Sequence, residues 1–243
     1  MSQGLGHDVR VAEVALLGRE MFTVPEAARL LDMNPATLLW WLEGRSQNTK
    51  TYPPVLRPAP TGSHVVTWGE FVEAGLLRQY RRVHKVKLPE LRSFIALVRE
   101  KIGAAYPLAH RRPYVGNGRR LVIEAQDEVG LPPELRLIAI VEGQGVLLPA
   151  ADLFLHRVEW DDDIASQWKP HHDPKSPVRM NPNVRFGRPA IGGISTSAIW
   201  EHLEDGADVD EVATAFSLRT DQVAWARAYE SSLHAPPPAA EVA

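Results

Sequence analysis

Residues 22–42 carry a pattern of apolar and capping residues that fits two short helices joined by a tight turn. Thr23 and Glu26 have capping-box spacing, in which a hydroxyl and a carboxylate satisfy the first free amides of a helix. Asn34, followed by a proline, is an N-cap that starts a second helix. Ala28 is small enough to let the two helices cross closely. The sequence therefore predicts a helix–turn–helix near its start.

A loop, a strand and a third helix are expected next. The segment from Ser46 to Pro60 holds four prolines, two threonines and the basic residues Lys50 and Arg57, and predicts a basic loop. A Gly-Ser turn and two valines after it indicate a short hairpin strand. Thr67 and Glu70 again have capping-box spacing and open a helix expected to reach Arg82.

Elements in this order resemble the MerR-type winged-helix DNA-binding domain. The resemblance covers about residues 22–102 and rests on the motifs T-V-P-E-A-A-R-L-L-D-M-N-P-A-T-L and G-S-H-V-V-T-W-G-E-F. Asp32 stands where that family usually has a glycine. The resemblance implies that the second helix enters the major groove by its N-terminal residues. The residues then expected to bind DNA are Asn34, Thr37, Trp40, Trp41, Arg45, Lys50, Arg57 and His64.

Charge is divided unevenly along the chain. Residues 45–92 hold nine basic and three acidic residues, a net charge of +6, whereas residues 124–173 hold eleven acidic and three basic residues, a net charge of −8. A basic half beside an acidic half is typical of a DNA-binding domain joined to a different module. The alternative is that the arginines at 78, 81 and 82 only make one face of a helix soluble and do not bind DNA.

Composition sets outer limits on the class of protein. A chain of 243 residues with 44% hydrophobic content can build two small cores. It contains no cysteine, which excludes disulfides, thiolate zinc sites and cysteine nucleophiles. No run approaches the roughly 20 apolar residues of a membrane helix, and the N-terminus lacks a signal-peptide pattern. A cytoplasmic protein without a membrane partner is therefore expected.

The middle of the chain predicts a small α+β segment. A helix starting near Leu88 has its apolar residues on one stripe, which favours a core role over a dimer surface. Residues 114–123, with Gly-Asn-Gly inside them, predict a β-hairpin. Two apolar runs at 135–141 and 153–160 are helix or strand, and the second alternates enough to favour a strand. Residues 169–182 are expected to form an extended linker.

Residues 178–230 carry a second set of ordered motifs. Four basic residues between Lys175 and Arg188 meet no acidic one, and glycines at 187, 192 and 193 permit sharp bends. Three capped helical patterns follow, opened by Ser195 or Thr196, by Asp208 and by Thr220. The last two helices again have helix–turn–helix spacing, but their net charge disfavours contact with DNA phosphate.

This segment resembles the antitoxin-associated domain of unknown function 433. The matching motifs are Asn-Pro at 181–182, F-G-R-P-A-I with a following glycine at 186–192, Thr196, and Asp-Glu-Val-Ala at 210–213. The whole architecture resembles the long form of a VapB-type antitoxin, whose partner is a PIN-like ribonuclease toxin. The residues expected to bind the toxin are Arg185, Phe186 and Arg188, since an arginine on a turn can pair with the carboxylates that hold the nuclease metal.

An enzyme is not expected. The chain has no phosphate-cradling glycine loop between a strand and a helix and no cysteine nucleophile. The pair of histidines at 171–172 lacks the spacing of a metal site, so no metal and no cofactor are expected. A second class of function stays open, a free-standing MerR-like transcriptional regulator whose rear half senses a small molecule or binds another protein.

The expected fold is mainly α with a small α+β middle, an N-terminal winged helix–turn–helix and a small C-terminal three-helix domain. The expected parts are an N-terminal extension (1–21), a winged-helix DNA-binding domain (22–105), an α+β linker subdomain (106–170), a toxin-binding helical domain (171–234) and a disordered tail (235–243). The expected function is that of a type II antitoxin, a homodimer that neutralises its toxin and represses its own operon by binding operator DNA.

Overall fold

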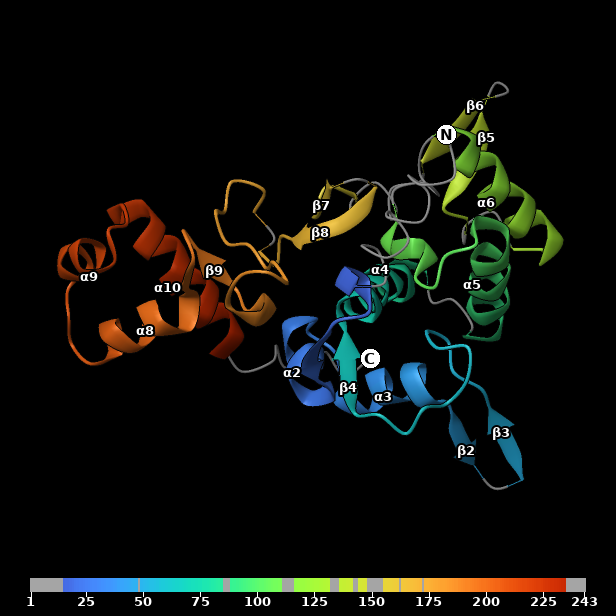
Figure 1. Ribbon diagram of the computed structural model, residues 1–243, viewed down its shortest axis with the longest axis horizontal. Helices are drawn as coiled ribbons and strands as arrows, with labels where there is room; N and C mark the ends of the chain where they lie inside the picture. Colours follow the sequence, from blue (N-terminus) through green and yellow to red (C-terminus); the bar gives the residue numbers. More distant parts are fainter. Residues whose placement is uncertain are drawn as a thin grey trace, which may run out of the picture. The chain divides into compact units, whose positions relative to one another are not determined.

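The structure, a computed structural model, describes residues 15–47, 49–84, 88–110, 116–131, 136–141, 144–147, 155–161, 163–171 and 173–234. The chain divides into two compact units, Met1–Trp168 and Lys169–Ala243. Helices and small antiparallel sheets make up both units (Figure 1). The expected mixture of helix with a smaller amount of β-structure is thus confirmed. Within the described part of the chain, no helix is both long and apolar enough to cross a membrane.

The elements of the first unit, in chain order, are β1 (Glu20–Thr23), α2 (Val24–Leu30), α3 (Pro35–Glu43), β2 (Arg45–Gln47), β3 (Lys50–Tyr52), β4 (Val65–Thr67), α4 (Trp68–His84), α5 (Leu88–Ile102), η1 (Pro107–Ala109), α6 (Gly116–Glu128), β5 (Ile138–Val141), β6 (Gln144–Leu147), β7 (Val158–Asp161) and β8 (Ile164–Trp168). The antiparallel strand pairs are β1–β4, β2–β3, β5–β6 and β7–β8.

The two helices expected near the start are present as α2 and α3. The Thr23 hydroxyl accepts a hydrogen bond from the Glu26 amide at 3.4 Å, and the Asn34 side chain accepts one from the Ala36 amide at 2.8 Å. Asp32, in the turn between the helices, has a φ of 48°. Its carboxylate pairs with Arg78 of α4, and its carbonyl oxygen accepts a hydrogen bond from the same guanidinium at 3.0 Å. These contacts offset the backbone cost that a glycine would have avoided.

The strand expected at 65–67 is present, but its partner is different from the expected one. β4 pairs with β1, which precedes the helix–turn–helix, rather than with a neighbour across a tight hairpin turn. The hairpin instead lies inside the segment expected to be a loop, where β2 pairs with β3. At the start of α4 the predicted capping box is confirmed, since the Thr67 amide donates to Glu70 at 2.9 Å and the Glu70 amide donates back to the Thr67 hydroxyl at 3.3 Å.

The core of the first unit is built around aromatic rings on α4. Phe71 lies 4.9 Å from Phe22 of β1 and 5.7 Å from Trp68, measured between ring centroids. Trp168, at the end of β8, meets Phe71 edge-on at 6.1 Å. The Trp68 indole donates a hydrogen bond to the Ala165 carbonyl at 2.6 Å. The β7–β8 hairpin, far along the sequence, is therefore part of the same core as the helix–turn–helix.

The prediction of a β-hairpin at 114–123 is wrong, because residues from Gly116 onward form α6. Val122, Ala125 and Gln126 are buried at helical spacing. Gln126 also accepts hydrogen bonds from the backbone amides of residues 137 and 138 and donates one to the Ile138 carbonyl, which fixes α6 to β5. The apolar stripe of α5 is buried as expected for a core role, at Leu91, Phe94, Ile95 and Val98.

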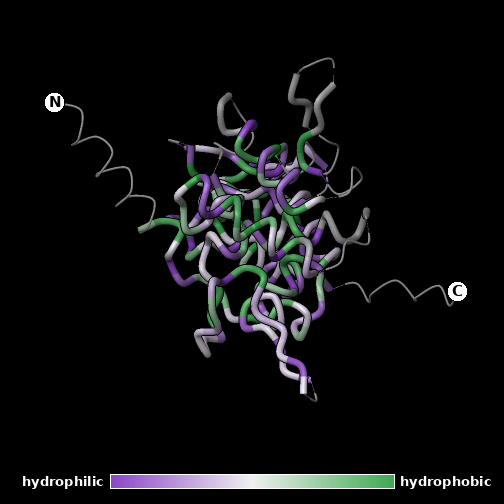
Figure 2. Tube along the Cα trace, turned by 90° about the vertical axis from the view of Figure 1, so that its right-hand side faces the viewer, coloured by the Kyte–Doolittle hydropathy of each residue, from purple (hydrophilic) through white to green (hydrophobic). Residues whose placement is uncertain are grey.

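The elements of the second unit are η4 (Arg185–Gly187), β9 (Ala190–Ile191), β10 (Ile194–Ser195), α8 (Thr196–Glu204), α9 (Val209–Phe216) and α10 (Thr220–His234). The three expected helices are confirmed. They enclose a core of Val178, Ile191, Ile199, Val212, Ala213, Val223, Ala226 and Tyr229. Hydrophobic and hydrophilic segments are interspersed along the Cα trace (Figure 2). Asp208 and Glu211 form a complete capping box at the start of α9.

Residues 169–182 are only partly the linker that the sequence predicts. Met180 and Val178 are buried, and Arg179 exchanges two backbone hydrogen bonds with Ala190, at 2.9 and 2.8 Å. His171 contacts the Trp225 ring edge-on with 5.2 Å between centroids. The end of this segment is thus built into the second unit. The second of the two adjacent histidines and the tail from residue 235 lie outside the described residues.

Candidate functional site

Two surfaces of the described chain combine exposed aromatic and basic side chains, one in each unit. In the first unit the surface lies at the end of α3 and on the β2–β3 hairpin. The guanidinium of Arg45 lies over the Trp40 ring, 4.6 Å from its centroid. Arg45 is paired across the hairpin with Tyr52, and Gln47 with Lys50, so these four side chains share one face of the ribbon.

We call this surface the aromatic–basic face, made of Trp40, Arg45, Lys50 and Tyr52. Trp40 and Tyr52 are each 41% exposed, unusually open for side chains of that size, and Lys50 is exposed. The hairpin extends away from the other elements of its unit (Figure 1). Flat rings and positive charges side by side on a projecting ribbon can stack on bases and pair with phosphates.

Three other residues expected to bind DNA have a mixed exposure. Asn34 is exposed, and its side-chain oxygen caps the Ala36 amide, which leaves its amide nitrogen and the second lone pair of that oxygen for a base. Thr37 is half-buried on the first turns of α3. His64 is exposed just before β4, and its carbonyl oxygen accepts a hydrogen bond from the Val24 amide at 3.1 Å. Asn34 and Thr37 therefore lie at the exposed start of α3.

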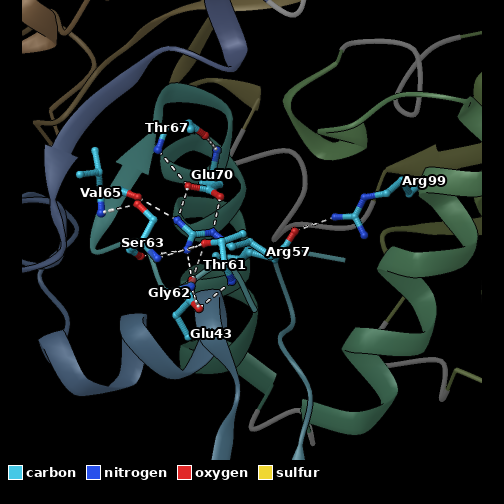
Figure 3. A network of polar contacts seen from close by, with 10 residues as sticks. Glu43, Arg57, Thr61, Gly62, Ser63, Val65, Thr67, Glu70 and Arg99 are labelled. Atoms are coloured by element: carbon cyan, nitrogen blue, oxygen red, sulfur yellow. Dashed lines mark hydrogen bonds and ion pairs between the residues drawn. The ribbon is translucent and has the colours of Figure 1, made fainter. Parts of the chain in front are cut away.

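Trp41 and Arg57, also expected to contact DNA, are buried instead. Trp41 is 2% exposed on the inner side of α3. Arg57 is 7% exposed and lies between two carboxylates (Figure 3). Its Nε donates to Glu70 at 2.6 Å, and one terminal nitrogen pairs with Glu43. Arginines in loops are usually exposed, whereas this one is the centre of a buried polar network.

The Arg57 network joins four segments of the chain. Its remaining donors reach the Thr61 hydroxyl at 2.7 Å and the carbonyl oxygens of Ser63 and Val65 at 3.0 and 2.8 Å. Glu43 in turn accepts hydrogen bonds from the Thr61 amide and the Gly62 amide, at 2.8 and 2.7 Å. The end of α3, the loop after the hairpin, β4 and the start of α4 are thereby held in one arrangement.

Hydrogen bonding decides the ionisation of this network. Burial acts to raise the pKa of Glu43, but the hydrogen bonds from Gly62, Thr61 and Arg57 outweigh it and hold the pKa below its usual value. Burial likewise acts to lower the pKa of Arg57, and its bonds to Glu70 and Glu43 raise the pKa overall. Both directions favour the charged forms of Glu43 and Arg57, which suits a buried ion pair.

Gly44, which follows Glu43 of the network, sets how the chain enters the hairpin. This residue has a φ of 75°, and a Cβ atom there would lie 2.4 Å from the Tyr52 carbonyl oxygen. Only a glycine allows the chain to leave α3 and enter β2 so close to the end of β3. From the other side, Arg92 and Arg99 of α5 donate to the carbonyl oxygens of Pro54 and Leu56, at 2.9 and 2.7 Å. The segments before and after the hairpin that carries the aromatic–basic face are thus both fixed to neighbouring elements.

The surface in the second unit is the turn formed by residues 184–188, which we call the Phe186 turn. Phe186 is 84% exposed, and Arg185 and Arg188 on either side of it are exposed as well. All three residues expected to bind a toxin therefore lie together on one turn. The buried residues Gly187 and Pro189 hold the turn against the rest of the unit.

Three successive residues of this turn have left-handed backbone conformations. The φ values are 48° at Arg185, 54° at Phe186 and 72° at Gly187. For each non-glycine residue such a conformation costs about 1–2 kcal/mol. The turn is held by hydrogen bonds from Gly187 to the Val184 carbonyl at 3.0 Å and from the Arg185 Nε to the Gly193 carbonyl at 2.8 Å. Arg185 therefore braces the turn, in addition to any role toward a partner.

Sequence reasoning missed Tyr52 and the true role of Arg57. Tyr52 stands between a threonine and two prolines, and only the register of the β2–β3 hairpin places it beside Arg45. The signal for Arg57 is weaker still. Its partners Glu43 and Glu70 stand 14 and 13 positions away along the chain.

The comparisons with known proteins include one family match, which lies within the second unit. Residues 178–229 match the family described as "Protein of unknown function (DUF433)". This match spans the Phe186 turn, α8, α9 and the first part of α10. Among curated proteins, the uncharacterized protein Rv2308 of Mycobacterium tuberculosis is 29% identical over 214 residues, covering 86% of this chain and 89% of that protein.

A second relative carries a functional name. The protein named "Putative antitoxin VapB45", also of Mycobacterium tuberculosis, is 25% identical over 219 residues, covering 84% of this chain and 90% of that protein. The chain is thus similar to a protein that carries an antitoxin name. Among solved structures, the crystal structure of Rv2018 from Mycobacterium tuberculosis superposes with a TM-score of 0.68 at 24% identity, covering 86% of this chain and 97% of that one. The last likeness concerns the fold alone.

Proposed function

We propose that this protein is the antitoxin of a type II toxin–antitoxin system. In this account it binds and neutralises a PIN-like ribonuclease toxin and represses its own operon by binding operator DNA. The observation that carries the proposal is the similarity to the named antitoxin, which extends over 90% of that relative and is joined by the family match at residues 178–229. A toxin partner follows from that similarity.

DNA binding is proposed for the first unit, through the aromatic–basic face and the start of α3. Arg45 and Lys50 would neutralise phosphates, and Asn34 and Thr37 would approach base edges in the major groove. The net charge of +6 over residues 45–92 favours a polyanion. Trp41 and Arg57 have no place in this interface, because both are buried. Their proposed role is to fix α3 and the hairpin in position.

Toxin neutralisation is proposed for the Phe186 turn. Nucleases of the PIN-like class hold Mg²⁺ or Mn²⁺ with clustered carboxylates. Arg188 would form charge-assisted hydrogen bonds with such carboxylates and compete with metal or substrate. Arg185 would do the same through the donors that its hydrogen bond to Gly193 does not use. A homodimer is proposed because operator sites are commonly two-fold symmetric and bind two copies of a helix–turn–helix.

A growth assay tests the proposal. The reading frame that adjoins this gene is expressed alone, and then together with the full chain. We expect growth arrest in the first case and restored growth in the second. Arrest that persists at a tenfold excess of this protein, or an adjoining product with no effect on growth, would speak for the free-standing regulator instead.

A further inference from the structure

Phe186 combines an exposed apolar side chain with an unfavourable backbone conformation. Large apolar side chains are normally buried, yet 84% of this one is open. Its φ of 54° lies in the region that a bulky residue rarely adopts. Single exposed apolar residues are common on protein surfaces. An exposed ring on a left-handed residue is different, because both the side chain and the backbone are unfavourable there.

The surrounding residues keep this conformation in place. Val184 donates to the Asn181 carbonyl at 2.9 Å and Gly187 donates to the Val184 carbonyl at 3.0 Å. The Arg188 amide donates to the Arg185 carbonyl at 3.1 Å, and the Arg185 side chain reaches across to Gly193. The ring is therefore presented on a rigid support. Little conformational entropy remains to be lost when a partner covers it, which favours tight binding.

We infer that Phe186 is the anchor of the toxin interface, and that it fills an apolar pocket of the partner whose rim carries carboxylates. The charge of the rim follows from Arg185 and Arg188, which flank the ring and are both exposed. Buried aromatic anchors surrounded by charged rims carry most of the binding energy in protein interfaces. The partner is the PIN-like nuclease, so this inference rests on the proposed function. The inference differs from the proposed function in that the Phe186 ring, rather than an arginine, makes the main contact.

The same strain supplies a test that separates binding from folding. Phe186→Gly removes the ring and relaxes the backbone, so the unfolding midpoint of the second unit should rise by roughly 2–6 °C while binding is lost. Ser217 offers a matched control, because it is exposed, has a φ of 53° at the end of α9 and lies in the same unit. Ser217→Gly should give a similar rise in midpoint with unchanged binding.

Calorimetric titration of the adjoining nuclease with the full chain measures the effect. We expect Phe186→Ala and Phe186→Gly to weaken binding at least ~30-fold, and Phe186→Leu to weaken it less than ~5-fold. If both weakening variants bind like wild type, the inference is overturned while the proposed function stands. If the wild-type chain does not bind the nuclease, the proposed function is overturned and the inference with it. A loss confined to Arg188→Ala would also overturn the inference, in favour of an arginine anchor.

Discussion

Glu73 of α4 is the most perturbed acid in the described chain. Its side chain is fully buried, and burial, helped by the nearby charge of Glu70, raises its pKa from 4.5 to about 8, against the opposing effects of Arg99 and of the Leu108 amide. One carboxyl oxygen accepts a hydrogen bond from Leu108 at 2.9 Å. Among the described residues, the other oxygen has no hydrogen-bond partner. Glu73 is therefore protonated in the folded protein at neutral pH.

The raised pKa makes the stability of the first unit depend on pH. Because the folded state keeps the proton between pH 4.5 and about 8 and the unfolded state does not, the free energy of unfolding should fall as pH rises through this range, by roughly 3–5 kcal/mol in all. Glu73→Gln should remove most of this slope. Urea unfolding at pH 5, 7 and 9 measures it, and parallel pH profiles for wild type and variant would contradict the assignment.

Arg57 should contribute to stability rather than to phosphate contact. Arg57→Lys keeps the charge but cannot reproduce the donors that reach Glu43, Glu70 and the loop carbonyls, so it should cost about 3–5 kcal/mol. Thermal unfolding checks this directly. A phosphate contact predicts the reverse pattern, a nearly unchanged midpoint together with DNA binding that the retained charge largely preserves.

The β2–β3 hairpin and the start of α3 should have separable effects on DNA binding. Lys50→Ala should weaken binding to every sequence about equally and lower the slope of log K against log salt by about 1. Asn34→Ser, which keeps a capping oxygen, should weaken specific binding more than nonspecific binding. Filter binding at several salt concentrations measures both. Binding of the wild-type chain without any salt dependence would exclude a phosphate interface.

Local signals in the sequence predicted the helices better than the strands. Caps and apolar periodicity define α2, α3 and α9, because both are set by residues within one or two turns. At α8 only the apolar periodicity is confirmed, since its N-cap residue Ser195 makes no side-chain capping hydrogen bond. The partner of β4 could not be predicted, since β1 lies more than 40 residues away along the chain. At 116–128 the Gly-Asn-Gly signal suggested a hairpin, but burial of Val122 and Gln126 at helical spacing decided for α6. Tertiary packing overrode a local turn signal there.

The sequence also predicted part of each candidate site. The glycines at 187, 192 and 193 predicted that Arg185 and Arg188 lie on a structured turn, and the structure has both on one turn with Phe186 between them. That the Phe186 ring is 84% exposed depends on the backbone angles of the turn, which the sequence does not determine. Arg57 was wrongly predicted to be exposed, because a basic residue in a proline-rich segment is usually a loop residue. Its burial depends on two carboxylates that are distant in the sequence and enclose it in the fold.

The two compact units suggest that DNA binding and toxin binding can be separated. Residues 169–243 form a unit with its own core, and from Glu201 to Glu230 they hold eight acidic and two basic residues, a net charge of −6. This fragment should bind the nuclease but not DNA, and residues 1–168 should do the reverse. Pull-down and filter binding of both fragments test the division. Capture of the nuclease only by residues 1–168 would contradict it.

The claim that this protein neutralises a nuclease is tested most directly by RNA cleavage. The purified product of the adjoining gene is incubated with RNA and Mg²⁺ or Mn²⁺, and the full chain is added in increasing amounts. We expect metal-dependent cleavage that stops at a fixed molar ratio of the two proteins. We also expect that Phe186→Ala, folded by circular dichroism, needs a large excess to inhibit. Cleavage that continues undiminished in an excess of the wild-type chain would contradict the account.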